Sequence, residues 1–260
     1  MPRYRLLLEF DGGPFCGWQI QANGPSVQAA LEAAADRMVR RMGPAVAAGR
    51  TDAGVHALAL PVQLDLEQTI MPERLMSGLN HHLRHLPIVV LWASLAQDGF
   101  HVRFNATARH YRYRILARRA PPALEHGRVW HVARSLDAER MQAAAETLVG
   151  RHDFTSFRDS ACQAASPVKT LGRLWVERHG PLIEIGACAP SFLHHQVRNL
   201  VGTLKVIGEG SKPVAFAAAA LAARSRAAAG PTAPAEGLYF VAADYPGEPG
   251  LAGRQSKKTP

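Results

Sequence analysis

The chain has 260 residues, of which 47% are hydrophobic and 20% are charged, enough for a sizeable core in one large domain or two small ones. Thirty Lys and Arg against twenty-one Asp and Glu give a net charge of +9, so an anionic partner, nucleic acid above all, is expected. No window reaches the roughly 20 apolar residues of a membrane-spanning helix, and the first residues do not resemble a signal peptide, so we expect a cytoplasmic protein without a membrane partner.

Hydrophobic periodicity in the first half predicts strands alternating with helices. The alternating apolar residues at 58–66 indicate a strand with one face in solvent. In chain order the predicted elements are a strand at 4–10, a helix capped by Ser26, a short strand running into residues 49–56, the strand at 58–66, a helix from Pro72 and a strand at 88–94.

The second half repeats this order of strands and helices. Its predicted elements are a strand at 110–117, a helix at 135–150, a hairpin turning at His179 and Gly180, a helix capped by Ser191, an alanine-rich helix from Pro213 to Gly230 and a strand at 238–245. We therefore predict an α+β fold with two similar halves, 1–108 and 109–246, a mixed, mostly antiparallel sheet, a central cleft and a flexible tail at 247–260.

The segment 100–120, FHVRFNATARHYRYRILARRA, is strongly basic. It holds six arginines and two histidines and no acid, which is typical of a binding surface for phosphates. Strand alternation places Tyr111 and Tyr113 on one face and Arg112 and Arg114 on the other. The tyrosines could stack on a base or fill the core, and the core suits Tyr113 better than Tyr111.

The sequence GRTDAGVH, residues 49–56, places Asp52 in a loop bounded by glycines. Alone, this carboxylate could simply bond the amides of a turn. The chain has no nucleotide-binding glycine loop and no zinc-deaminase pattern, and its three scattered cysteines form neither a disulfide framework nor a metal site. In SFLHHQVRNLVGTL the residues Leu193, Val197 and Leu200 predict a buried helical stripe, with Arg198 on the adjacent face.

Six motifs over residues 4–246 resemble, in order and spacing, the TruA family of tRNA pseudouridine synthases. They are FDGGPFCGWQIQ, GRTDAGVHA, FHVRFNATARHYRYRI, HDFTSFR, FLHHQVRNLVGTL and EGLYFVAADYP. The resemblance implies isomerisation of uridine to pseudouridine at positions 38–40 in the anticodon stem-loop of tRNA. It also implies a homodimer and, because the rearrangement is redox-neutral, no cofactor and no metal.

The resemblance also implies roles for individual residues. Asp52 corresponds to the catalytic aspartate, Arg198 to its arginine partner, and Tyr111 to the tyrosine that stacks on the uracil and assists proton removal at C5. Arg50 corresponds to an arginine near the flipped nucleotide, and Leu238 to an apolar wall of the pocket. Asp52 could attack C6 of the base, attack C1′, or take a proton from C2′.

Phosphate contacts are expected from the basic segment, with Arg103, Arg109 and Arg112 as the first candidates. His194 and His195 are left outside the catalytic set, because histidines beside a helix are more often structural. The segment 80–90, NHHLRHLPIVV, departs from the family pattern NxxLPxDI. The main alternative is a non-catalytic RNA-binding protein on the same scaffold. A metal-dependent hydrolase is a weaker alternative, because it would need a metal-binding cluster of acidic residues and the sequence around Asp52 has none.

Overall fold

The computed structural model describes residues 1–247, so nearly all of the predicted tail lies outside the described residues. Contacts divide the chain into unit 1, which contains Met1–Arg109 and the chain from Tyr239 onward, and unit 2, His110–Leu238. The strand pairs are mostly antiparallel, and helices alternate with strands, which confirms the predicted α+β class with a mixed sheet. Within residues 1–247, no helix is both long enough and apolar enough to cross a bilayer.

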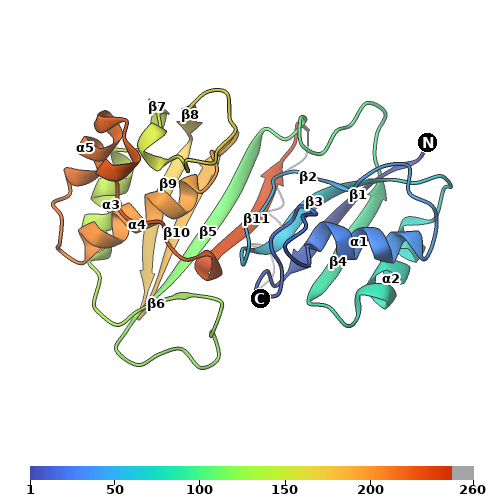
Figure 1. Cartoon of the computed structure of the whole chain (residues 1–260), viewed down its shortest axis with the longest axis horizontal. Helices are drawn as coiled ribbons and strands as arrows, with labels where there is room; N and C mark the ends of the chain where they lie inside the picture. Colours follow the sequence, from blue (N-terminus) through green and yellow to red (C-terminus); the bar gives the residue numbers. More distant parts are fainter. Residues whose placement is uncertain (248–260) are drawn as a thin grey trace. The chain divides into compact units, whose positions relative to one another are not determined.

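In unit 1, β1 lies between β4 and β3 and is antiparallel to both, while β11 pairs with β3 in parallel. Helix α2 packs on β4, and α1 packs against α2 (Figure 1). The Ser26 side chain accepts a hydrogen bond from the Ala29 amide, and Pro72 is the first residue of α2, so both predicted helix starts are confirmed. The elements are β1 (Arg3–Phe10), α1 (Val27–Asp36), β2 (Val46–Ala47), β3 (His56–Asp65), α2 (Pro72–Leu83), β4 (Ile88–Leu95) and β11 (Leu238–Asp244).

The prediction that β3 has one face in solvent is wrong. Pro61 and Gln63, which belong to the face expected to be wet, are buried together with Leu60 and Val62. The Val102 amide donates to the Gln63 side chain at 3.3 Å, so the loop that precedes β5 covers this face. Local alternation could not reveal a covering segment that lies 39 residues further along the chain.

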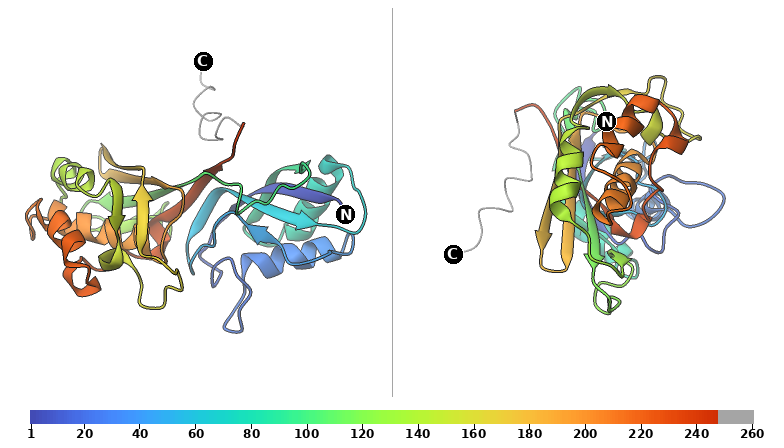
Figure 2. Two further views of the ribbon diagram at one scale, coloured as in Figure 1. Left: turned by 90° about the horizontal axis from the view of Figure 1, so that it is seen from above. Right: turned by 90° about the vertical axis from the view of Figure 1, so that its left-hand side faces the viewer.

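In unit 2, β10 lies between β5 and β9, and the hairpin of β9 and β10 turns at Gly180, which has a φ of 59°. Helix α3 contacts β9, and α3, α4 and α5 contact one another (Figure 2). A small sheet of β7 and β8 was not predicted. The elements are β5 (Ala108–Ala117), β6 (Trp130–Val132), α3 (Ala138–Glu146), β7 (Gly150–Asp153), β8 (Val168–Leu171), β9 (Arg173–His179), β10 (Leu182–Ala189), α4 (Gln196–Gly208) and α5 (Phe216–Ala223).

The predicted boundaries of three helices in unit 2 are wrong. Helix α3 spans Ala138–Glu146 and not 135–150, because Asp137 caps its start and Gly150 already belongs to β7. Helix α4 begins at Gln196 after His195, not after Ser191, because the side chain of Gln196 accepts a hydrogen bond from the Leu193 amide and forms a turn before the helix. Leu193 is buried as expected but lies outside the helix. Helix α5 ends at Arg224, whose φ of 48° is left-handed, and so does not reach Gly230.

Candidate functional site

Asp52 lies in the loop between β2 and β3, and the segment after β1 holds this loop by backbone hydrogen bonds. The Trp18 amide donates to the Thr51 carbonyl at 3.0 Å, and the Gly54 amide donates to the Phe15 carbonyl at 3.2 Å. These bonds fix the residues on both sides of Asp52. Two motifs that are separate in the sequence, FDGGPFCGW and GRTDAGVH, therefore form one structural unit.

Two glycines allow this close approach of backbones. A Cβ atom at Gly12 would lie 2.0 Å from the Val55 carbonyl oxygen, and one at Gly17 would lie 2.5 Å from the Thr51 carbonyl oxygen. Gly17 also has a φ of +97°, which a side chain disfavours. The glycines of the first motif are thus required by the position of the Asp52 loop.

His56, the last residue of GRTDAGVH, connects the loop to a third motif. It is 2% exposed, its Nδ1 accepts the Gly12 amide at 3.0 Å, and its ring stacks on Tyr239 with centroids 4.8 Å apart. Tyr239 comes from EGLYF and is the register partner of His56 in the parallel pair of β3 and β11. His56 was not among the predicted site residues, although it stands inside the motif.

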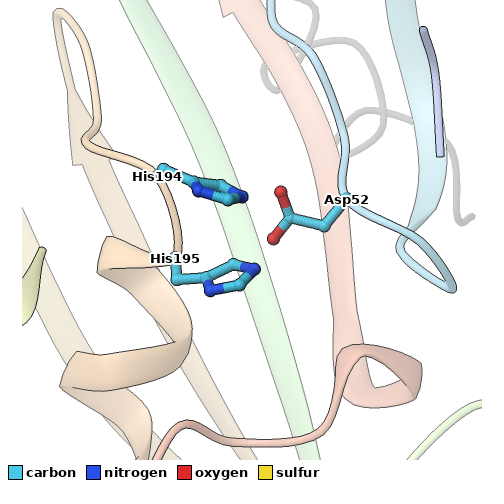
Figure 3. Close-up of side chains that lie close together, drawn as sticks. All are labelled: Asp52, His194 and His195. Atoms are coloured by element: carbon cyan, nitrogen blue, oxygen red, sulfur yellow. The ribbon is translucent and has the colours of Figure 1, made fainter. Parts of the chain in front are cut away.

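Side chains of the loop alternate between the interior and the surface. Thr51 is 7% exposed and buried, whereas Arg50 is exposed and Asp52 is half-buried. The Asp52 carboxylate extends from the loop as drawn in Figure 3. The loop thus presents Arg50 and Asp52 outward, and Thr51 anchors it.

Arg109 connects the Asp52 loop to the basic loop before β5. Its guanidinium donates to the Ala48 carbonyl at 3.2 and 3.1 Å, to the Ala106 carbonyl at 2.9 Å, and to the Arg103 carbonyl. Much of its donor capacity is therefore used by the backbone of unit 1. Arg103, by contrast, points from the same loop as an exposed side chain.

The two tyrosines of β5 have different surroundings, as the sequence suggested. Tyr113 is fully buried, its hydroxyl donates to the Pro234 carbonyl at 2.7 Å, and burial raises its pKa well above the usual range. Tyr111 is half-buried, and its ring meets Phe192 edge to face with centroids 5.1 Å apart. Tyr113 is a core residue, and Tyr111 is the one accessible from the surface.

Leu238 and the glycine before it complete the apolar packing of unit 2. Leu238 is 4% exposed at the start of β11. A Cβ atom at Gly237 would lie 2.6 Å from the ring of Tyr113, so only glycine fits beneath this tyrosine. The EGLYF motif therefore packs against the core tyrosine of β5.

The acid-free basic segment acquires acidic neighbours when the chain folds. Glu184 of β10 lies 3.7 Å from the Arg112 guanidinium and 3.5 Å from that of Arg114, and Glu125 pairs with Arg114 at 2.7 Å. The Arg112 side chain stays 37% exposed. Its charge is thus partly offset by a residue that is 72 positions away in the sequence.

Arg198, in the first turn of α4, is held by the segment that precedes β11. Its Nε donates to the Ala233 carbonyl at 2.7 Å, and the Ala233 amide donates back to the Arg198 carbonyl at 3.1 Å. A Cβ atom at Gly202 would lie 1.7 Å from the Pro231 carbonyl oxygen, so this glycine lets the segment cross the helix. These contacts orient the Arg198 side chain.

His194 and His195 form a ring pair immediately before α4. Their centroids are 4.0 Å apart (Figure 3). The Nδ1 of His195 forms a hydrogen bond with the Asp159 carboxylate at 2.7 Å. The pKa of the Asp159 carboxyl is lowered, first by a hydrogen bond from the Ala161 amide and then by the two histidines. His195 has a left-handed φ of 60°, so it occupies a strained position at the start of the helix.

Comparisons with known proteins agree on one family. The sequence model described as tRNA pseudouridine synthase matches residues 144–246. The chain is 56% identical to tRNA pseudouridine synthase A of Rhodospirillum centenum over 245 residues, which are 94% of this chain and all of that protein. The chain belongs to the tRNA pseudouridine synthase A family. It is also 55% identical to the family member of Rhodopseudomonas palustris BisB18 and 49% identical to that of Maricaulis maris, covering 94 and 95% of this chain and 100 and 99% of those proteins.

Membership of this family confirms the resemblance that the six motifs predicted. The sequence reasoning did not select His56, Phe192 or Asp159. Each of them contacts a predicted residue or the segment beside it, so only the structure could assign it a place. The one signal available in the sequence was that the aspartate motif ends in a histidine, His56.

Proposed function

We propose that this protein isomerises uridine to pseudouridine in the anticodon stem-loop of tRNA, at positions 38–40, with Asp52 as the catalytic carboxylate. The observation that carries the proposal is an aspartate on a braced loop in a chain 56% identical to a tRNA pseudouridine synthase A. The bond between C1′ and N1 breaks, the uracil turns, and C5 bonds to C1′. The proton lost from C5 is balanced by the one gained at N1, so the reaction is a net isomerisation.

The remaining predicted residues have proposed roles around this carboxylate. Arg198 is the proposed partner of the Asp52 carboxylate in the reaction, whether that group attacks C6, attacks C1′ or takes a proton from C2′. Tyr111 stacks on the uracil and assists removal of the C5 proton, and Leu238 forms an apolar wall. Arg50 holds the extruded nucleotide.

The basic segment is proposed to bind the tRNA backbone. Arg103 and Arg112 contact phosphates, which their exposure supports. Arg109 contributes to the same surface chiefly by holding the loop that carries Arg103, since its donors engage backbone carbonyls. With tRNA as substrate, we expect the protein to act in the cytoplasm.

The experiment is tritium release from tRNA transcribed with 5-³H-uridine, followed by mapping of the modified positions. Wild type should release tritium, and Asp52→Asn should not, although it still binds tRNA. Asp98→Asn, which neutralises an exposed carboxylate elsewhere in unit 1, is the matched control and should act as wild type. Tight binding without release by wild type would instead support the non-catalytic RNA-binding protein.

A homodimer is proposed as the working form. Strand β4 is at the edge of the sheet in unit 1 and exposes Val89, Leu91, Trp92 and Leu95 by 41–48%. Apolar edge strands favour association with another chain, which supports this proposal. Light scattering should give twice the monomer mass, and a charge introduced by Leu91→Glu should lower it. A monomeric mass for wild type at working concentration would contradict the proposal.

A further inference from the structure

The loop between β4 and β5 holds a phenylalanine in solvent. Phe104 is 77% exposed, whereas Phe10, Phe15 and Phe240 of the same unit are 0–5% exposed. Folding usually removes a large apolar side chain from water. A phenylalanine at the tip of a loop therefore requires an explanation, either in its partner or in a flexible backbone.

The backbone of this loop is anchored on both sides of the tip. Val102 is fully buried, and its carbonyl accepts the Tyr245 hydroxyl at 2.7 Å. The amides of Arg103 and Phe104 both donate to Nδ1 of His101, at 3.1 and 3.3 Å. The exposure of Phe104 is thus built into the loop.

Arg109 anchors the other side of the tip and links it to the Asp52 loop. Its guanidinium donates to the carbonyls of Ala106 and Arg103 in this loop, and to that of Ala48, four residues before Asp52. The phenylalanine and the proposed catalytic carboxylate therefore belong to one braced part of unit 1.

The chemistry around Phe104 fits a nucleobase. The ring of His101 lies against that of Phe104 with centroids 4.3 Å apart and 33° between the planes, which supports one side of the phenyl ring. Arg103 beside it is exposed, and residues 99–107 contain no acid. A flat apolar ring next to a cation matches a base with its phosphate.

We propose that Phe104 stacks on an unpaired base of the tRNA anticodon loop, near the target uridine, while Arg103 binds the phosphate of the same strand. This inference rests on the proposed function, since it takes tRNA as the substrate. Stacking holds the loop open beside the extruded uridine, so its loss weakens binding more than it slows the chemical step. Phe104 is thus a binding residue.

The test compares Phe104→Ala, Phe104→Leu and Phe104→Trp with wild type in tRNA binding and tritium release. Stacking predicts a loss of affinity of roughly 10- to 100-fold for the alanine variant and a similar KM increase with kcat largely kept. The leucine variant, whose side chain is apolar but has no π face, should bind tRNA much more weakly than wild type does. The tryptophan variant should bind tRNA with the affinity of wild type. Arg103→Ala is the control for a phosphate contact and should lower the slope of affinity against salt, which Phe104→Ala should leave unchanged.

A direct readout uses the tryptophan variant. A stacked base should quench the indole emission when tRNA is added, relative to wild type treated in the same way. If Phe104→Ala bound tRNA as tightly as the wild-type protein does, and the wild-type protein released tritium, the stacking would be overturned and the proposed function would stand. No tritium release by wild type would overturn the proposed function instead. A changed oligomeric mass in Phe104→Ala, with unchanged tRNA affinity, would assign the ring to a protein contact and overturn this inference.

Discussion

Gly17→Ala tests how far the Asp52 loop depends on the segment after β1. The new Cβ atom would lie 2.5 Å from the Thr51 carbonyl oxygen, whereas ordinary contact begins near 3.4 Å, so the two segments must separate by about 0.9 Å. A displacement of about 1 Å in a catalytic group costs on the order of 100-fold in rate. We therefore expect turnover in the tritium-release assay to fall by about that factor.

The same substitution should lower the free energy of unfolding. A left-handed residue with a side chain costs about 1–2 kcal/mol, and overpacking adds about 1–3 kcal/mol. The sum, roughly 2–5 kcal/mol, is a large part of a typical stability of about 5–15 kcal/mol. Urea unfolding measures this loss, and activity is compared at a temperature at which the variant stays folded.

Two further glycine variants separate the effect of backbone strain from that of the close contact between the new Cβ atom and a carbonyl oxygen. Gly180→Ala places a side chain at a φ of +59° with no atom within 4 Å, so it should cost about 1–2 kcal/mol and keep wild-type turnover. Gly12→Ala has no left-handed φ but meets the Val55 carbonyl at 2.0 Å, so it should impair turnover as Gly17→Ala does. If Gly17→Ala kept the turnover of Gly180→Ala, the bracing of Asp52 by this segment would be refuted.

Three other predictions concern the neighbouring groups. Arg109→Lys keeps the positive charge but loses the planar guanidinium that donates to several carbonyls at once. Turnover should therefore drop, while the dependence of tRNA affinity on salt concentration should stay as in wild type. Full activity of the lysine variant would show that only the charge of Arg109 matters. Tyr113→Phe should lower the free energy of unfolding by roughly 1–2 kcal/mol at pH 7, because the hydrogen bond to the Pro234 carbonyl is lost. Because the pKa of Tyr113 is raised in the native protein, the stability of wild type in urea unfolding should also fall as the pH rises above about 10, and the variant should lack this fall. The native pKa of Asp159 is lowered, first by the Ala161 amide and then by His195, so the ionised carboxylate stabilises the protein above about pH 4 and this stabilisation is lost below that pH. Asp159→Asn should therefore have a lower free energy of unfolding than wild type at pH 7. Urea unfolding at decreasing pH should show the difference in unfolding free energy between the two proteins becoming smaller.

Local signals predicted the elements whose causes are local. Ser26 caps α1 through its own hydroxyl, and Pro72 begins α2, as each residue does in most proteins. Gly180 supplies the left-handed turn of the β9–β10 hairpin. Ser191 failed as a helix cap because the competing turn depends on a side chain, that of Gln196, which the cap rule does not consider.

Long-range contacts explain what the sequence did not predict. The solvent face of β3 is covered by the loop at Val102, and the basic face of β5 meets Glu184. Periodicity describes one element at a time and contains no information about which segment will lie upon it. The order and spacing of six motifs carried more information, since they pointed to the family directly.

The position of Asp52 is the clearest case of a site built from distant parts of the sequence. The carboxylate stands on a loop whose neighbours are fixed by Gly12, Gly17 and Tyr239, the first two before it in the chain and the last nearly at the end. His56 joins two of these contacts through one buried imidazole. Removing that ring would leave the Gly12 amide without its acceptor and open a gap beneath Tyr239. The loop would then lose two supports at once, although Asp52 itself is unchanged, so the precision of the site depends on residues other than Asp52.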